Sequence, residues 1–480
     1  MKPQNKANDK PMKSPYLYAL AIALMLCCCT PAGNKTDIYP QPAPGFVSLQ
    51  DGHFAVDGEP WFPLMLNYKA FIKGDSVAPA PWYTGHLREN FDTIAAWGFN
   101  AVRVCLDVLD EDGDTAAMFA ATRRMVQLAD SAGLRVMLLI KPPFDGQWHD
   151  YAIGLMHRLA DLPALWAYDL MNEPLYFDPA ENRRKDGAVS VVAGWRKMVR
   201  EHAPHQLFTV ALSEPIEVFR WDPSLLPVDF LEIHTYHPLR VQSEMWWYSH
   251  YTGKPWMIGE TGLPADNRSV GYDDQVRFMR ETYDYARDLG AIGYGWWEFT
   301  DYPDGVNFEA QYTGLRDIHG QRKPAAALVA LLDSGYTASA PEFPSNYYNM
   351  LAYRNVAVTG TVTDRKGRPI EGAVVRGWNE WWGIGMNTYT DAEGRFRLVS
   401  NDICVHFEVS APGFSRLKFD RSVTFPEGTE LPDREREYQQ MTLTGWGPAD
   451  GRILPHGSDE RYEAPTAVEA SIGNITLMRL

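Results

Sequence analysis

The stretch LWAYDLMNEP, residues 165–174, is a short and mostly apolar run that ends on an amide, a carboxylate and a proline. Such runs are typical of parallel strands that are covered on both faces. Pro174 has no backbone N–H to offer a sheet, so it is a suitable place for a strand to end. We therefore interpret the stretch as a buried strand whose tip presents Asn172 and Glu173.

Similar apolar runs recur along the chain and alternate with helical patterns. Strands followed by helical crossovers, repeated eight times, predict a (β/α)8 TIM barrel. A doubly wound open sheet is the alternative, but the first run is not followed by a glycine-rich phosphate-binding sequence. Besides residues 165–172, the predicted strands are residues 61–67, 100–106, 134–140, 207–212, 229–236, 255–260 and 291–298.

The pattern of apolar and polar residues changes after about residue 340. The stretch VAVTGTVTDRKGRPIEGAVVRGW, residues 356–378, alternates apolar and polar positions around turn signals, which predicts a small all-β sandwich. Its motif resembles the carboxypeptidase-regulatory-like domain. We expect a barrel domain over residues 46–336, a linker over residues 337–354 and the sandwich over residues 355–480.

The N-terminus has the layout of a targeting segment. Lysines precede an apolar run at residues 17–26, which is too short to cross a bilayer permanently, and Cys27, Cys28 and Cys29 follow. The pattern resembles a bacterial lipoprotein signal, with an ordinary secretory signal as the alternative. The resemblance implies a signal peptide over residues 1–28, a lipidated Cys29 with either neighbour as an alternative, and a tether over residues 29–45. We therefore expect export and anchoring to a bacterial membrane, the outer membrane in particular.

Charge and cysteine content exclude other classes. The 45 basic and 61 acidic residues give a formal net charge of −16, the wrong sign for a partner of nucleic acid. Cys105 and Cys404 lie in different predicted domains, each within a strand-like run. This favours two buried thiols over a disulfide framework or a metal site.

Two glutamates stand at predicted strand ends. Glu173 ends the fourth strand and Glu260, in WMIGETG, ends the seventh. The carboxyl ends of barrel strands form the active site in this fold, and strands four and seven face one another across it. Two carboxyl groups across a cleft are what glycoside hydrolysis requires.

Further candidates lie at other strand tips. Arg103 could pair with a carboxylate, and the alternation in IHTYHP directs His234 and Tyr236 to the same side. Trp297 offers a flat apolar face for a sugar ring.

The combination resembles clan A of the glycoside hydrolases and is most similar to family 5, the cellulase and mannanase family, over roughly residues 50–330. The resemblance implies that Glu173 is the acid/base and Glu260 the nucleophile of a retaining enzyme. It also implies that Asn172 binds the hydroxyl beside the reacting carbon. The residues expected to complete the subsite are Arg103, His234, Tyr236 and Trp297.

The expected substrate is a polysaccharide or oligosaccharide of the β-mannan or β-glucan type, and no metal or cofactor is expected. Trp246 and Trp247, directly after the sixth strand, are candidates to extend the substrate site, with core packing as the alternative. Two other functions stay open from the sequence. One is a transglycosylase of the same clan, and the other is a catalytically inactive glycan-binding lipoprotein.

Overall fold

The chain has 480 residues, and a computed structural model describes its fold over several ranges. The ranges are residues 43–108, 114–140, 149–174, 184–236, 241–268, 270–305, 308–333, 356–378, 385–400, 404–423 and 468–480. The predicted signal peptide, Cys29, most of the tether and the predicted linker lie outside them. Within these ranges, no helix is both long enough and apolar enough to cross a membrane.

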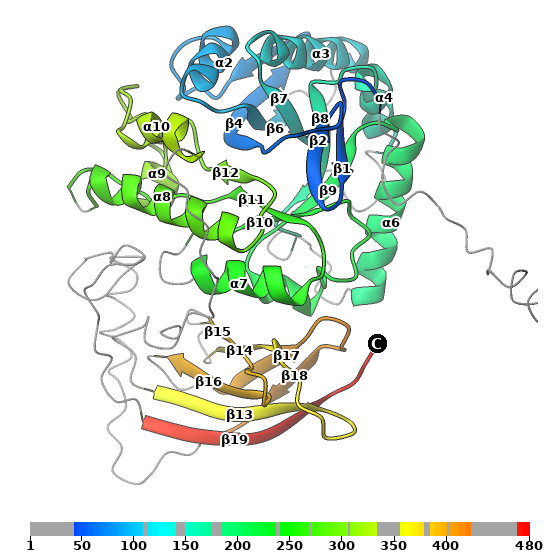
Figure 1. Cartoon of the computed structure of the whole chain (residues 1–480), viewed down its shortest axis with the longest axis vertical. Helices are drawn as coiled ribbons and strands as arrows, with labels where there is room; N and C mark the ends of the chain where they lie inside the picture. Colours follow the sequence, from blue (N-terminus) through cyan, green and yellow to red (C-terminus); the bar gives the residue numbers. More distant parts are fainter. Residues whose placement is uncertain are drawn as a thin grey trace, which may run out of the picture. The chain divides into compact units, whose positions relative to one another are not determined.

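A closed parallel barrel occupies the first part of the described chain (Figure 1). The ring closes because β12 pairs in parallel with β4, Gly295 lying opposite Met65. This confirms the predicted (β/α)8 fold, and each predicted strand is present. In order around the ring, the strands are β4 (Leu64–Lys73), β6 (Ala101–Val108), β7 (Arg135–Leu139), β8 (Leu165–Asn172), β9 (Leu207–Leu212), β10 (Leu231–His234), β11 (Trp256–Glu260) and β12 (Tyr294–Trp296).

Helices surround these strands, and the longer ones bury one apolar side against them (Figure 1). In α3, the side chain of Asp114 accepts hydrogen bonds from the first free backbone N–H groups, which fixes where the helix begins. A 3-10 helix, η1 (Pro215–Phe219), lies between β9 and β10. The helices are α2 (Leu87–Ala96), α3 (Thr115–Ser131), α4 (His149–Leu159), α6 (Lys185–His202), α7 (Val241–Tyr251), α8 (Tyr272–Asp288), α9 (Phe308–Tyr312) and α10 (Ala325–Leu328).

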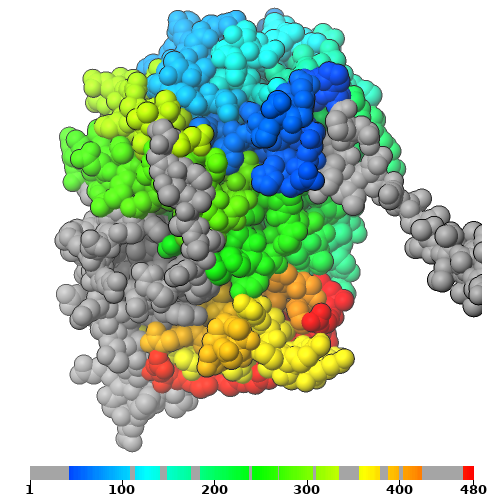
Figure 2. All heavy atoms as spheres, viewed as in Figure 1, coloured from blue at the N-terminus to red at the C-terminus, as the bar shows by residue number. Residues whose placement is uncertain are grey.

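The amino end of the barrel is covered by short antiparallel strands, β1 (Val47–Gln50), β2 (His53–Val56) and β3 (Glu59–Pro60), which the sequence did not predict. Phe54 packs edge-on against Trp166 and Phe230 at centroid distances of 5.1 and 5.0 Å. Figure 2 shows the atoms of this segment in blue on the surface of the molecule. Apolar packing therefore fills this end, and polar groups gather at the opposite, carboxyl end of the strands.

Two sheets form the C-terminal module, in the orders β16-β13-β19 and β15-β14-β17-β18. Apolar side chains such as Val358, Phe396 and Phe407 form their shared core. This confirms the predicted β-sandwich. Its strands are β13 (Val356–Asp364), β14 (Val374–Trp378), β15 (Gly385–Tyr389), β16 (Arg395–Ser400), β17 (His406–Ser410), β18 (Leu417–Asp420) and β19 (Val468–Leu477).

The module and the barrel share a hydrophobic core. Val374 and Tyr389 of the sandwich belong to the same cluster of buried residues as the barrel helices. On the barrel side, the indole Nε1 of Trp247 donates a hydrogen bond to the carbonyl oxygen of Gly372 at 2.8 Å. Removing the module would therefore expose barrel residues that are now buried.

Candidate active site

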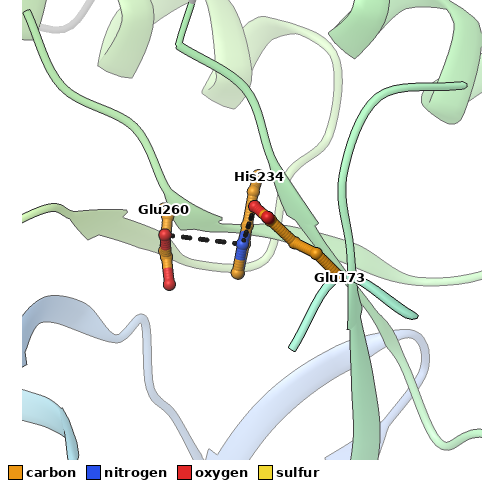
Figure 3. Close-up of side chains that lie close together, drawn as sticks. All are labelled: Glu173, His234 and Glu260. Atoms are coloured by element: carbon orange, nitrogen blue, oxygen red, sulfur yellow. Dashed lines mark hydrogen bonds and ion pairs between the residues drawn. The ribbon is translucent and has the colours of Figure 1, made fainter. Parts of the chain in front are cut away.

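Glu173 and Glu260 lie at the carboxyl ends of β8 and β11, as predicted, and their side chains point toward one another. Figure 3 shows His234, from the end of β10, between the two carboxyl groups. One carboxylate oxygen of each glutamate and one ring nitrogen of His234 lie within 4.8 Å of one another. The two acids are thus close enough to act on the same bond.

Glu260 is held by two donors. The Nη1 atom of Arg103 donates to its Oε1 at 2.5 Å, and the hydroxyl of Tyr236 donates to its Oε2. The glutamate is only 5% exposed. Because both oxygens are engaged, the carboxylate is fixed in orientation before any substrate binds.

Arg103 is fully buried on β6 and connects several strand ends. Its Nε and Nη2 atoms donate to Asp169 at 3.0 and 2.6 Å, and Nη1 donates to the amide oxygen of Asn67 at 3.0 Å. It also donates to the amide oxygen of Asn172 at 2.7 Å. Since the oxygen of Asn172 faces Arg103, its amide nitrogen faces away and can donate to a sugar hydroxyl.

Two buried carboxylates beneath the site were not among the predicted residues. Asp169 on β8 and Glu232 on β10 have no exposed surface, and Glu232 Oε1 lies 3.1 Å from Arg103 Nε. Burial raises the pKa of Asp169 to about 7, with Glu232 adding to the rise and Arg103 opposing it. For Arg103, burial alone would lower the pKa, but Glu232, Asp169 and Glu260 outweigh it and hold that pKa well above its usual value.

The sequence contained a signal for Glu232 only. Residues two apart on a strand face the same side, and Glu232 stands two residues before the predicted His234 on the same strand. The same reasoning does not reach Asp169, because a bulge between Asp169 and Asn172 breaks the alternation near the end of β8.

His234 is 2% exposed, and its Nδ1 atom lies 2.8 Å from Glu173 Oε1 and 3.5 Å from Glu260 Oε2. Burial alone would lower its pKa, but the carboxylates of Glu260, Glu173 and Glu232 outweigh burial and raise the pKa of His234 to about 10. The imidazole is therefore a cation at neutral pH. It donates to Glu173 and keeps positive charge between the two acids.

The backbone of Glu173 has a left-handed conformation, with φ of 48°, which residues other than glycine adopt rarely. Its N–H donates to the carbonyl oxygen of Ala211 on β9 at 2.9 Å, which holds this turn in place. The turn directs the side chain toward His234. A strained residue held by its surroundings at a strand end is a common feature of functional sites.

Glu173, His234 and Glu260 also have the spacing of a metal-binding group. Their surroundings disfavour a cation, because the guanidinium of Arg103 lies 2.5 Å from Glu260 and His234 itself carries positive charge. The three side chains fit acid–base chemistry better than metal coordination.

The predicted aromatic residues separate into two groups. The backbone N–H of Trp297 donates to the carbonyl oxygen of Thr261 at 2.8 Å, which places it beside Glu260. Trp247 is fully buried, so it has no surface to offer a sugar. Trp246 stacks on His250 of the same helix at a centroid distance of 3.6 Å. The structure thus brings Trp297 to the site and gives Trp247 a packing role.

The C-terminal module and the barrel are similar to different known proteins. Residues 357–432 match the family described as the carboxypeptidase regulatory-like domain, which confirms the resemblance of the C-terminal module. No curated protein matches the chain.

Several solved structures with a similar fold are glycosidases. An exo-β-1,4-mannosidase from Opitutaceae bacterium strain TAV5 is 19% identical, over 66% of this chain and 64% of that chain, with a TM-score of 0.49. GH5_18 from Streptomyces cattleya in complex with GlcNAc is 18% identical over 58% and 78%, with a TM-score of 0.44. A β-glucuronidase from Faecalibacterium prausnitzii is 15% identical over 61% and 52%, with a TM-score of 0.45.

This chain spans less than two thirds of the length of the mannosidase. The similarity to these structures is one of fold. The resemblance of the barrel to clan A lies in its motifs at the strand ends.

Proposed function

We propose that this protein is a retaining glycoside hydrolase that cleaves β-glycosidic bonds. The observation that carries the proposal is the approach of the Glu173 and Glu260 oxygens to within 4.8 Å at the carboxyl end of the barrel. Retaining enzymes hold their two carboxyl groups about 5 to 5.5 Å apart, whereas inverting enzymes leave roughly 6.5 to 9.5 Å to admit a water. The nearest oxygens of the two acids leave less than the gap that an inverting enzyme needs for its water, which supports retention.

In the first step, a carboxylate oxygen of Glu260 attacks the anomeric carbon as the bond to the leaving oxygen breaks. Glu173 gives its proton to that oxygen, so the leaving group departs as an alcohol and the sugar stays bound to Glu260 as an ester. In the second step, Glu173 takes a proton from water, and the resulting hydroxide displaces Glu260 at the same carbon. Both carboxyl groups return to their starting states.

The neighbours of the two acids suit these steps. Arg103 and Tyr236 fix the Glu260 carboxylate, and His234 holds Glu173 through its Nδ1 atom. Groups that are positioned before the reaction need no rearrangement during it. We assign the amide of Asn172 to the hydroxyl beside the reacting carbon, because its oxygen accepts from Arg103 and its nitrogen is left to donate.

The proposed substrate is a polysaccharide or oligosaccharide of the β-mannan or β-glucan type. Trp297 lies next to the residues that follow Glu260, and its ring offers the flat apolar face on which a pyranose packs.

A hydrolysis screen tests the proposal. Purified protein is incubated with 4-nitrophenyl β-glycosides, β-mannans and β-glucans, and released phenol and reducing sugar are measured. We expect activity on at least one of these substrates and its near-complete loss in Glu260→Gln. Tight binding of a glycan by calorimetry without any product would instead identify a binding protein. Products longer than the substrate would identify a transglycosylase.

We also propose that the protein is exported and anchored to a membrane through Cys29, on the strength of the sequence pattern at residues 17–29. Replacing Cys27, Cys28 and Cys29 with Ser should move the protein from the membrane fraction to the soluble fraction. Unchanged incorporation of labelled fatty acid in that variant would refute the anchor.

A further inference from the structure

Lys69 lies at the mouth of the barrel, close to the proposed site. Two residues before it on β4, Asn67 faces the barrel interior, because its amide donates to the carbonyl oxygens of Gly259 and Trp296 at 2.8 and 3.1 Å. The oxygen of Asn67 accepts from Arg103, which also binds Glu260. Strand alternation directs Lys69 to the same side as Asn67, one step nearer the carboxyl end.

Three aromatic rings surround the ammonium group of Lys69. Its Nζ atom lies 5.3 Å from the ring centroid of Trp297, 5.7 Å from that of Trp82 and 6.0 Å from that of Tyr302. Trp82 and Tyr302 stack on each other at 4.1 Å. We refer to these three rings as the aromatic box. Such faces attract a cation and hold it in position without neutralising it.

No anion in the described part of the chain forms an ion pair with Lys69 within 4.0 Å. Burial raises the pKa of the neighbouring acid Glu298 and the charge of Lys69 opposes this rise, but the two residues form no ion pair. The Oε2 atom of Glu298 accepts a hydrogen bond from the hydroxyl of Tyr83 at 2.7 Å instead. By contrast, the buried Lys323 pairs with Asp301 at 2.8 Å. Lys69 is only partly buried, and its ammonium therefore has donors to offer an incoming group.

We propose that Lys69 binds an anionic group on the sugar that lies against Trp297. The carboxylate of a hexuronic acid and a sulfate ester share this chemistry. Each is planar or compact, carries negative charge and accepts several hydrogen bonds from an ammonium. This inference rests on the proposed glycosidase function and changes its substrate class, from a neutral β-mannan or β-glucan to a β-linked glycan that carries an anionic sugar.

The charge of the whole chain has the same sign as such a substrate. At a formal net charge of −16, the protein repels anionic glycans at long range. A lysine at the sugar-binding face counters that repulsion where the substrate binds. The aromatic box meanwhile supplies apolar surface for the ring of the same sugar.

Matched substrate pairs test the inference. We compare kcat/KM for 4-nitrophenyl β-hexuronides with the corresponding neutral β-hexosides in the gluco, galacto and manno series, and for sulfated hexosides with their unsulfated parents. The enzymes are the wild type, Lys69→Met, Lys69→Arg and Lys73→Met. Lys73 is an exposed lysine at the end of the same strand, so its replacement removes the same charge away from the aromatic box.

In the wild type we expect at least one charged substrate to be preferred over its neutral partner. Lys69→Met should lower that preference by about 10- to 100-fold, the range typical of a charged hydrogen bond. Lys69→Arg should recover part of it, and Lys73→Met should leave it unchanged. The pair that responds identifies the carboxylate or the sulfate as the bound group.

A preference for neutral sugars in the wild type would overturn the inference. So would an equal fall on charged and neutral substrates in Lys69→Met, because that result describes a lysine that only supports the fold. If no glycoside is hydrolysed, the proposed function fails on its own account. Calorimetry then tests the subsite separately, by measuring hexuronate and hexose binding to Lys69→Met and Lys73→Met. Equal affinity of the two variants for hexuronate would contradict the inference.

Discussion

Glu173 and Glu260 are the same kind of residue in two different environments. The Glu260 side chain is 6% exposed and is held by Arg103 and Tyr236, whereas the Glu173 side chain is 19% exposed and is held by His234. A fixed, buried carboxylate suits a nucleophile, and a carboxyl group with access to solvent suits proton exchange with a leaving group and with water.

Replacing each glutamate with Ala should therefore have different effects. Glu260→Ala should be nearly inactive on every substrate, because the proposed nucleophile is lost. Glu173→Ala should keep much of its first step on a dinitrophenyl glycoside, whose leaving group needs no proton, and then accumulate the glycosyl-enzyme. Added azide should restore turnover in Glu173→Ala and yield a β-glycosyl azide, measured by release of dinitrophenol and by mass spectrometry. Rescue of Glu260→Ala with a β-glycosyl azide product would contradict the roles.

His234 gives a prediction about pH. The folded-state pKa is raised from 6.5 to about 10, so protonation of His234 contributes stability that is fully present below pH 6.5 and is lost as pH rises toward about 10. The free energy of unfolding of the wild type minus that of His234→Gln should therefore be largest at acidic pH and shrink between pH 6.5 and 10. Urea titrations across this range measure it, and a difference that does not vary with pH would contradict a charged His234.

At the residue scale, the sequence predicted what stands at strand tips and missed what lies below them. Glu173, Glu260 and His234 were predicted because a polar residue at the end of an apolar run is conspicuous. Arg103 was also predicted at a strand tip, but it lies inside β6 and reaches Glu260 through the barrel interior. Asp169 lies inside such a run, where it reads as an isolated exception. Only the ring closure shows that it faces Arg103.

At the scale of elements, the strands of the barrel were predictable because burial on both faces requires apolar runs. The covering strands β1 and β2 were not, because each spans only four residues and lacks a long pattern. The sequence also does not show where the backbones of two strands approach one another closely. A Cβ atom added at Gly295 on β12 would lie 2.2 Å from the carbonyl oxygen of Gly259 on β11.

Gly295→Ala should therefore destabilise the barrel by about 1–3 kcal/mol or more, since backbone rather than a movable side chain blocks the new methyl group. Gly194 on α6 is the matched control, because a Cβ atom there meets nothing within 4 Å. Gly194→Ala should stabilise the protein by roughly 0.5–1 kcal/mol, as alanine favours the helix. Urea unfolding compares the two, and equal effects would refute the crowding at Gly295.

At the scale of the whole molecule, barrel and sandwich are more closely joined than the expectation of a linker between two domains suggested. The partners of the Trp247 hydrogen bond are 125 residues apart in the chain, and no local pattern in the sequence connects them. Lys185 on α6 makes a second connection. Its ammonium lies 3.3 Å from Asp222 of the barrel and donates to Ser410 and to the carbonyl oxygen of Phe414, both at 2.6 Å.

Lys185→Met should lower the free energy of unfolding by about 3–5 kcal/mol, because it leaves the buried Asp222 without its cation. Lys197→Met, on the same helix, should change it by no more than about 0.5 kcal/mol, since the Lys197 side chain is 75% exposed. Urea unfolding of both variants measures the difference. A loss in Lys185→Met no larger than in Lys197→Met would contradict the role of this connection.

The stereochemistry of the first-formed product tests the central proposal most directly. Proton NMR follows the anomeric signals during hydrolysis of an aryl β-glycoside by the wild type, before the released sugar equilibrates. Double displacement through Glu260 inverts the anomeric carbon twice, so the β-anomer should appear first and the α-anomer should grow only by mutarotation. Initial release of the α-anomer would contradict the retaining mechanism and the roles proposed for Glu173 and Glu260.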